Sequence, residues 1–229
     1  MIVTIDGPAG AGKSTVARML AQQLGFLFLD TGAMYRCVVY LAMKQGIAWD
    51  DLDALGELAR ALPLKFEQDR VMLDREDVTD EIRSAEVTAA IFHAADNLQV
   101  RAALVSLQRE LAQDIDVVTE GRDQGTVAFP HAKCKIYLSA SPRQRAQRRL
   151  DQLKLTVPDL TLDQVMQQQA LRDEQDMARE VGGLQAAEDA LFLVTDGLTA
   201  REVVAEIERL VILRKTESDD DQEIPPGES

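Results

Sequence analysis

The stretch Gly7-Pro8-Ala9-Gly10-Ala11-Gly12-Lys13-Ser14 decides the fold of this chain. It fits the pattern G-x-x-x-x-G-K-[ST] in full, and it stands between the apolar run 2–5 and a segment with helical periodicity at 13–24. A strand, a glycine-rich loop and a helix in this order form a P-loop, in which backbone N–H groups and the positive end of the helix hold phosphate oxygens. The sequence therefore predicts an ATP phosphate cradle made of Gly7, Pro8, Ala9, Gly10, Ala11, Gly12, Lys13, Ser14 and Thr15.

Two side chains of this loop have specific tasks in the prediction. Lys13 is expected to reach the β- and γ-phosphates of ATP, and Ser14 to hold Mg²⁺ through its hydroxyl group. The alternative, a glycine-rich turn that matches by chance, is disfavoured by the strand before it and the helix after it. Asn97 is the only asparagine in the chain. The Asn-Lys-x-Asp motif of typical GTPases is therefore absent, which excludes the commonest kind of GTPase switch.

Apolar runs alternate with helical segments along the rest of the chain. This alternation predicts an α/β fold with a parallel sheet that is covered by helices on both faces. The expected strands are 2–5, 26–29, 117–119, 135–138 and 191–194, and the expected helices include 13–24, 101–113, 142–153 and 201–213.

One segment departs from this alternation. Three short strand-like pieces joined by polar turns fill residues 63–83, and the helical segments 54–62 and 84–97 flank them. We interpret residues 63–83 as a small β insertion within a single domain, because the regular alternation resumes after it.

Composition limits the class of protein. A chain of 229 residues suits one sizeable domain, and no apolar run approaches the roughly 20 residues of a membrane span. The N-terminus enters a strand without a signal-peptide pattern, so we expect a cytoplasmic protein. A formal charge of −14 argues against a nucleic-acid partner. The two cysteines, Cys37 and Cys134, lie far apart in apolar segments and are expected to be buried thiols.

The C-terminal end differs in composition from the rest. Residues 216–229 contain six acidic residues, no lysine or arginine, and the sequence Pro225-Pro226-Gly227. Such a segment has too little apolar surface to fold by itself. We therefore expect a domain at 1–213 and an acidic, disordered tail at 214–229.

Two loops that follow strands are candidates for binding an acceptor molecule. Asp30-Thr31-Gly32-Ala33-Met34-Tyr35-Arg36 comes after the second strand, and Glu120-Gly121-Arg122-Asp123-Gln124-Gly125-Thr126 comes after a later one. Ligands of open α/β sheets bind at the carboxyl ends of the strands, where the P-loop also lies. The alternatives are a helix start capped by Asp30 or Thr31, and a surface turn in which Arg122 and Asp123 form an exposed ion pair.

Two sets of charged residues lie further along the chain. Arg143, Arg145, Arg148 and Arg149 crowd the start of one helix, where like charges cost stability unless an anion or acids offset them. They form either a lid over polyphosphate or a solvated helix face. The spacing of Arg172, Asp176 and Arg179 predicts one face of a helix. This second set is either a surface salt-bridge ladder or a row that contacts hydroxyl and phosphate groups.

Taken together, these motifs resemble the bacterial cytidylate kinase family, nucleoside monophosphate kinases that move a phosphoryl group from ATP to CMP or dCMP. The resemblance covers residues 1 to about 213. It rests on the order of the P-loop, Asp30–Arg36, the insertion ending Glu76-Asp77-Val78-Thr79-Asp80-Glu81-Ile82-Arg83, Val100-Arg101, Glu120–Thr126 and Arg172–Arg179.

The resemblance implies a role for each matching position. It implies a five-stranded parallel sheet, a helical lid over about 142–179, Mg²⁺ with ATP as donor, and a monomer. The residues implied to bind CMP are Arg36, Arg122 and Arg179 at the phosphate, Arg172 and Asp176 at the sugar, and Arg101 and Asp123 at the cytosine edge, with Thr31 and Tyr35 in the same set. The catalytic residues implied are Lys13, Arg122 and the lid arginines Arg145, Arg148 and Arg149.

Two other functions are kept open by the sequence. Phe92 stands where the family has a small hydroxyl residue near the base, which allows a P-loop kinase for UMP, dTMP or a non-nucleotide alcohol. An ATP-binding regulator without catalysis is the alternative from another class, with the acidic tail as its contact to a partner. The complete set of Lys13, Ser14 and arginines favours the kinase.

Overall fold

The computed structural model describes residues 1–67, 70–154, 157 and 159–220. The chain forms two compact units. Unit 1 comprises Met1–Phe28, Ile115–Ala178 and the chain from Gly182 onward, and unit 2 comprises Leu29–Asp114 with Arg179–Val181. None of the described helices is long and apolar enough to cross a membrane.

A five-stranded parallel sheet flanked by helices, as expected, forms the centre of unit 1. Only Leu29 and Asp30, the last two residues of β2, are assigned to unit 2. The strand order is β2-β6-β1-β7-β8, so β1 is the middle strand. The strands are β1 (Ile2–Asp6), β2 (Leu27–Asp30), β6 (Val117–Gly121), β7 (Cys134–Ser139) and β8 (Leu191–Val194), and the helices of this unit are α1 (Lys13–Leu24), α6 (Pro142–Leu153), α7 (Leu162–Ala178) and α8 (Ala200–Asp220), with a π-helical turn η2 (Gln124–Ala128).

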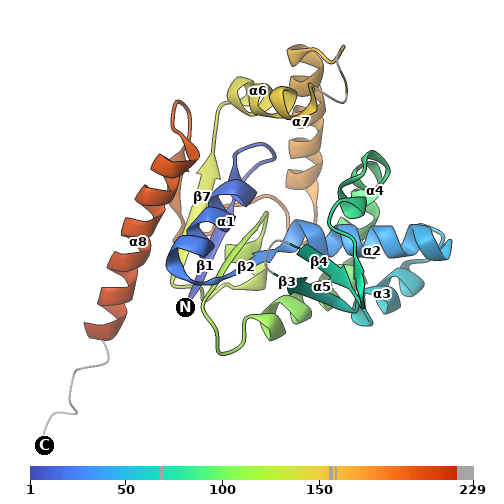
Figure 1. Cartoon of the computed structure of the whole chain (residues 1–229), viewed down its shortest axis with the longest axis horizontal. Helices are drawn as coiled ribbons and strands as arrows, with labels where there is room; N and C mark the ends of the chain where they lie inside the picture. The colour runs from blue at the N-terminus through green and yellow to red at the C-terminus, as the bar shows by residue number, and fades with distance from the viewer. Residues whose placement is uncertain (68–69, 155–156, 158, 221–229) are drawn as a thin grey trace, which may run out of the picture. The chain divides into compact units, whose positions relative to one another are not determined.

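The register of the sheet aligns the ends of its central strands. Asp6 at the end of β1 pairs with Gly121 of β6 and with Tyr137 of β7. Alternate residues of β1, Val3 and Ile5, belong to the main apolar cluster of this unit. Helices α1 and α8 complete the cluster and lie side by side next to β1 and β7 (Figure 1). The P-loop between β1 and α1 therefore starts from a strand that is buried from Val3 to Asp6.

Unit 2 is mostly helical. Helix α2 packs against α4, and α3 packs against α5. A three-stranded antiparallel sheet, β3-β4-β5, occupies the expected insertion and is followed by a short 3-10 turn. The bounds are α2 (Thr31–Gln45), α3 (Leu52–Arg60), β3 (Leu64–Glu67), β4 (Arg70–Leu73), β5 (Glu76–Asp77), η1 (Glu81–Arg83), α4 (Ala85–Ala95) and α5 (Leu98–Leu111).

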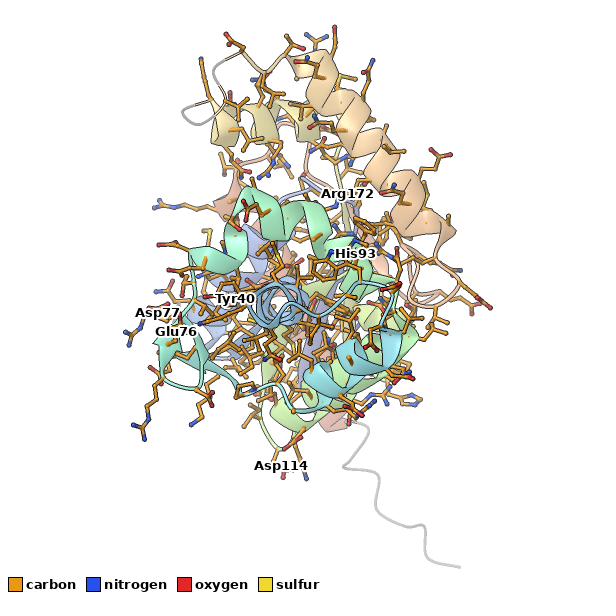
Figure 2. All side chains as sticks on the ribbon, turned by 90° about the vertical axis from the view of Figure 1, so that its right-hand side faces the viewer. Tyr40, Glu76, Asp77, His93, Asp114 and Arg172 are labelled. Atoms are coloured by element: carbon orange, nitrogen blue, oxygen red, sulfur yellow. The ribbon has the colours of Figure 1, made fainter. Side chains whose placement is uncertain are left out.

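Polar contacts attach the small sheet to α2. Tyr40 and Lys44 lie one helical turn apart on α2, and both donate hydrogen bonds to the carboxylate of Glu76 on β5, at 3.4 and 2.8 Å (Figure 2). Val78 and Ile82, which follow β5, are fully buried. Exposed ion pairs stabilise little by themselves, so the buried side chains after β5 contribute more to holding the insertion.

Two sequence expectations about helices need correction. Helix α7 ends at Ala178, so Arg179 does not share a helical face with Arg172 and Asp176 as predicted. Helix α8 continues past the predicted end at Leu213 to Asp220, because no glycine or proline interrupts the sequence there. The expected disordered tail thus starts inside a helix, and its residues 221–229 lie outside the described part of the chain. Cys37 and Cys134 are buried free thiols, as expected.

Candidate active site

The P-loop has the predicted strand–loop–helix geometry. Gly7 follows β1 directly with φ +145°, and a Cβ atom at this position would lie 2.0 Å from the backbone oxygen of Leu138 on β7. Only glycine fits such a close approach of two backbones. Helix α1 begins at Lys13, so the positive end of the helix and the loop N–H groups meet at one place, which is the arrangement for holding phosphate.

Lys13 is buried beneath its own loop. Its Nζ donates to the backbone oxygen of Pro8 at 2.9 Å. Burial, followed by the positive charge of Arg122, lowers the pKa of Lys13 to about 7, although Glu120 and Asp6 act in the opposite direction. An anion at the loop would restore the charged form of this amine. The site is thus electrostatically prepared for a polyphosphate.

Two acids at the ends of adjacent strands were missed by the sequence analysis. Glu120 of β6 accepts a hydrogen bond from Ser14 Oγ at 2.9 Å. Asp6 of β1 accepts the backbone N–H groups of Gln124 and Gly125 at 2.9 and 2.7 Å. Burial raises the pKa of Asp6 to about 6. Each acid is the first charged residue after an apolar run. This position at the end of a predicted strand is the signal by which both could have been found.

The residues present fit a magnesium ion. Mg²⁺ prefers oxygen ligands and uses one or two from the protein while phosphates and waters supply the rest. The Ser14 hydroxyl and the Glu120 carboxylate are such ligands, already in contact with each other. Among the described residues no cluster of three or more acids, histidines or cysteines forms a protein-only metal cage. A metal held together with a nucleotide therefore suits this site better than one held by protein alone.

The arginines of α6 divide into two kinds. Arg145 and Arg148 contact the P-loop: Arg145 Nη1 donates to the Ala9 oxygen at 2.9 Å, and Arg148 Nη1 donates to the Ala11 oxygen at 3.1 Å. Arg143 is exposed, and Arg149 donates to Gln152 within the same helix. For Arg145 and Arg148, the solvated helix face considered above is therefore excluded.

The turn after β6 is not an exposed ion pair either. Arg122 Nε donates to the Asp176 carboxylate at 2.7 Å, and only 18% of the arginine and 5% of the aspartate side chain is exposed. Burial alone would lower the pKa of Arg122, but the negative charge of Asp176 raises it above its ordinary value. Asp123 is buried as well. Arg172 of α7 (Figure 2) is near enough to Lys13 to lower the pKa of that amine.

In unit 2, three of the predicted acceptor arginines converge on α4. Arg36 donates to Thr88 Oγ1 at 2.7 Å, and Arg101 donates to the Ala95 oxygen at 3.2 Å. Arg179 Nε donates to Asp96, the residue that ends this helix, at 2.6 Å. The contact of Arg36 thus lies in the first half of α4, and those of Arg101 and Arg179 lie together at its C-terminal end.

The remaining predicted residues of unit 2 lie at the start of α2. Asp30 caps this helix by accepting the N–H of Ala33 at 2.9 Å, so the capping expected as one alternative is present. Thr31 is buried, and the Tyr35 ring lies 5.9 Å from the guanidinium carbon of Arg101. The cap and the candidate binding residues therefore coexist in this segment.

Phe92 occupies the middle of α4. It is 46% exposed, and its ring packs on His93, with 3.9 Å between ring centroids. His93 in turn stacks on Trp49 at 4.6 Å and nearly parallel to it. Thr88, Phe92 and Asp96 follow each other at intervals of four, so they lie along one side of the helix. An aromatic side chain thus lies between the contact points of Arg36 and Arg179.

Comparisons with known proteins agree with this architecture. The family model described as cytidylate kinase matches residues 3–212. A protein named cytidylate kinase from Rhodopirellula baltica is 50% identical, with 92% of each chain covered. A protein of the same name from Exiguobacterium is 44% identical over 91% of this chain and 95% of its own.

A longer relative and a solved structure extend the comparison. A bifunctional pantoate ligase/cytidylate kinase from Trichormus variabilis is 46% identical over 90% of this chain, which corresponds to 40% of that protein. The crystal structure of an uncharacterized protein from Eubacterium ventriosum has a TM-score of 0.52 at 9% identity, with 92% of this chain and 98% of that chain covered. It supports the fold alone. Because the family model matches residues 3–212 and the two relatives named cytidylate kinase are 50% and 44% identical over 92% and 91% of this chain, this chain belongs to the cytidylate kinase family.

Proposed function

We propose that this protein transfers the γ-phosphoryl group of ATP to CMP or dCMP and gives CDP or dCDP. The observation that carries the proposal is a complete P-loop beside the buried Arg122–Asp176 ion pair at the end of the neighbouring strand, in a member of the cytidylate kinase family. Phosphoryl transfer needs its two reactants held in line and the charge of the transferred group stabilised. A phosphate-holding loop and a fixed arginine in one unit suit both needs.

On the donor side, the loop from Gly7 to Thr15 holds the phosphates of ATP. Lys13 and the arginines of α6 stabilise the negative charge of the transferred group, and Ser14 holds the metal with Glu120 beside it. When bound, Mg²⁺ neutralises charge on the donor phosphates. The contacts of Arg145 and Arg148 with the loop support this assignment because they keep both guanidinium groups next to the cradle.

On the acceptor side, each proposed role follows the family resemblance. Three arginines hold the phosphate of CMP, two residues of α7 contact the sugar, and two residues read the cytosine edge. The residues are Arg36, Arg122 and Arg179 for the phosphate, Arg172 and Asp176 for the sugar, and Arg101 and Asp123 for the base, with Thr31 and Tyr35 in the same set.

No protein nucleophile enters this mechanism. The attacking atom is a phosphate oxygen of CMP, which is already ionised at neutral pH, so the reaction requires no general base. Asp123 is therefore assigned to the edge of the cytosine ring and not to proton abstraction. Closure of the α6 segment over the donor would exclude water and limit hydrolysis of ATP. We expect the enzyme to act as a cytoplasmic monomer.

A second candidate function is favoured by one observation. The exposed ring of Phe92 lies along α4 between the contacts of two acceptor arginines. An aromatic face binds any pyrimidine by stacking and selects weakly among them. Phosphorylation of UMP or dTMP therefore remains the alternative within the kinases, and ATP binding without turnover remains the alternative outside them.

The test is ADP release from Mg-ATP with CMP, dCMP, UMP and dTMP supplied separately. CMP and dCMP are expected to give fast turnover. Arg122→Ala should lower kcat/KM for CMP by about a hundredfold, because the acceptor phosphate loses a fixed cation. Arg70→Ala, which removes an exposed arginine that pairs with Glu67 on the small β insertion, is the matched control and should change nothing. Absence of turnover with every monophosphate would reject the proposal in favour of an ATP-binding regulator.

A further inference from the structure

The buried face of α7 is mostly polar. Gln169, Asp173 and Asp176 are buried along it together with Val165, at intervals that place them on one side of the helix. Burying carboxylates and amides costs free energy unless each is paired. Asp176 has its partner in Arg122. Asp173 is paired with Ala9 of the P-loop and with Arg145 of α6, and Gln169 Nε2 donates to the backbone of Arg145. None of the roles proposed above uses Gln169 or Asp173.

Asp173 and Arg145 together hold both backbone polar groups of one P-loop residue. The Ala9 N–H points to Asp173 Oδ1 at 3.4 Å, and Arg145 Nη1 donates to the Ala9 oxygen at 2.9 Å. The same Nη1 lies 2.5 Å from Asp173 Oδ2. These three contacts close a ring through Ala9, Asp173 and Arg145. The side chains of Arg145 and Asp173 are only 8% and 12% exposed, so water competes little with the ring.

The next loop residue is enclosed by the same two helices. A Cβ atom at Gly10 would lie 2.7 Å from Gln169 Nε2 and 3.2 Å from Arg145 Cβ. Gln169 Nε2 also donates to the Arg145 backbone oxygen at 3.3 Å, which fixes α7 to α6 at this point. Gln169 and Asp173 are four residues apart and lie on the same side of α7. Ala9 is thus hydrogen-bonded to α7, and Gly10 lies closely against it.

We propose that Asp173 is a positioning residue for ATP binding: through Arg145 and the Ala9 N–H, it fixes the first half of the P-loop so that the following N–H groups point at the phosphates. The loop contains several glycines, and each adds backbone freedom that binding would otherwise have to remove. A carboxylate that holds the loop before ATP arrives avoids that loss. Because Ala9 N–H is engaged by Asp173, the phosphate is bound by the N–H groups after it.

Given the proposed function, α7 contributes to both the donor side and the acceptor side of the reaction. Arg172 and Asp176, the residues assigned to the acceptor sugar, flank Asp173 on the same helix. A shift of α7 would therefore move the sugar contacts together with Ala9 and Gly10 of the P-loop. One helix would keep donor and acceptor contacts of unit 1 in register.

The test is binding of Mg-ATP without any acceptor, measured by calorimetry on Asp173→Asn, together with the thermal midpoint and the dissociation constant of CMP. We expect the dissociation constant of Mg-ATP to rise about tenfold, because a charge-assisted hydrogen bond to Arg145 is lost. CMP binding should stay within about twofold. Glu174→Gln, which removes the same charge from the neighbouring exposed residue, should leave both constants unchanged.

A double-mutant cycle with Arg145→Gln examines whether Asp173 acts through the arginine. Adding Asp173→Asn to Arg145→Gln should weaken Mg-ATP binding little further, since the ring is already open. Additive losses, an unchanged Mg-ATP constant, or a parallel loss of CMP binding and thermal midpoint would each overturn the proposal. If Asp173→Asn does not fold, Arg145→Lys replaces it, because lysine lacks the fork that contacts Ala9 and Asp173 together. The Mg-ATP constants and the thermal midpoints need neither turnover nor CMP, so they test the proposal even if CMP is not the acceptor.

Discussion

At the scale of single residues, the site is organised by buried charges with fixed partners. Lys13 has its pKa lowered to about 7 by burial, whereas Asp176 raises the pKa of Arg122. The charges of Lys13 and Arg122 therefore depend differently on pH and on bound ligands. Arg122 stays charged at every working pH, while the charge of Lys13 depends on what lies in the loop.

The state of Lys13 predicts proton uptake on ATP binding. Above pH 7 the free protein carries a mostly neutral Lys13, and polyphosphate draws a proton back onto it, so the affinity for Mg-ATP should fall by up to about tenfold for each pH unit above 7. Calorimetry at pH 8 in two buffers with different ionisation enthalpies measures the uptake. Lys13→Arg is the control, because arginine stays charged and takes up no proton. Equal, zero uptake in both proteins would contradict this account.

At the scale of elements, the P-loop depends on the neighbours of its strand and helix as much as on its own sequence. The loop leaves β1 against the backbone of β7, and α6 and α7 contact its middle. A P-loop motif by itself specifies none of these neighbours. The position of the loop therefore depends on contacts with β7, α6 and α7 as well as on its own glycines.

Gly7 should be the least replaceable glycine of the loop. In Gly7→Ala the new Cβ would meet the Leu138 oxygen, and the strands must separate, so we expect the free energy of unfolding to fall by more than about 4 kcal/mol. Gly25→Ala is the matched control. It also has positive φ but open space around the new Cβ, and should cost only about 1 kcal/mol. Urea denaturation measures both. Similar losses in the two variants would show that the approach to β7 does not limit this position.

The elements also show which features of the fold and the site could be predicted from the sequence. Helix α1 and strand β8 have the predicted bounds, because a P-loop motif and an isolated apolar run mark their own limits. Arg179 was wrongly placed on a helix because spacing alone does not reveal where a helix ends. Asp173 and Glu120 were missed because their partners, Arg145 and Ser14, are distant in sequence and meet only through sheet order.

At the scale of the whole molecule, the two units carry different parts of the proposed site. The P-loop and its arginines belong to unit 1, and the three arginines around α4 belong to unit 2. Each set is held by contacts within its own unit. In the proposed assignment, the residues that hold ATP are therefore in unit 1, and part of the set for CMP is in unit 2.

Hydrogen exchange with each substrate alone should separate these two groups. Mg-ATP is expected to slow exchange in residues 7–15 and at the start of α6, while the amides of α4 change little. CMP alone should slow exchange in α4, because Arg36, Arg101 and Arg179 all contact that helix. Exchange followed by mass spectrometry provides the measurement. Equal protection of both units by Mg-ATP would contradict the separation.

The position of β1 in the sheet has a consequence for synthesis on the ribosome. Both partners of β1 lie far along the chain, since Ile2 pairs with Val117 and Val3 with Cys134. At about 5–20 residues per second, the strand waits on the order of ten seconds before either partner is made. Most of unit 2 is the continuous segment Leu29–Asp114, which is complete before then. During translation most of unit 2, with Arg36 and Arg101, can therefore fold first, while the strand that leads to the ATP loop is still without a sheet.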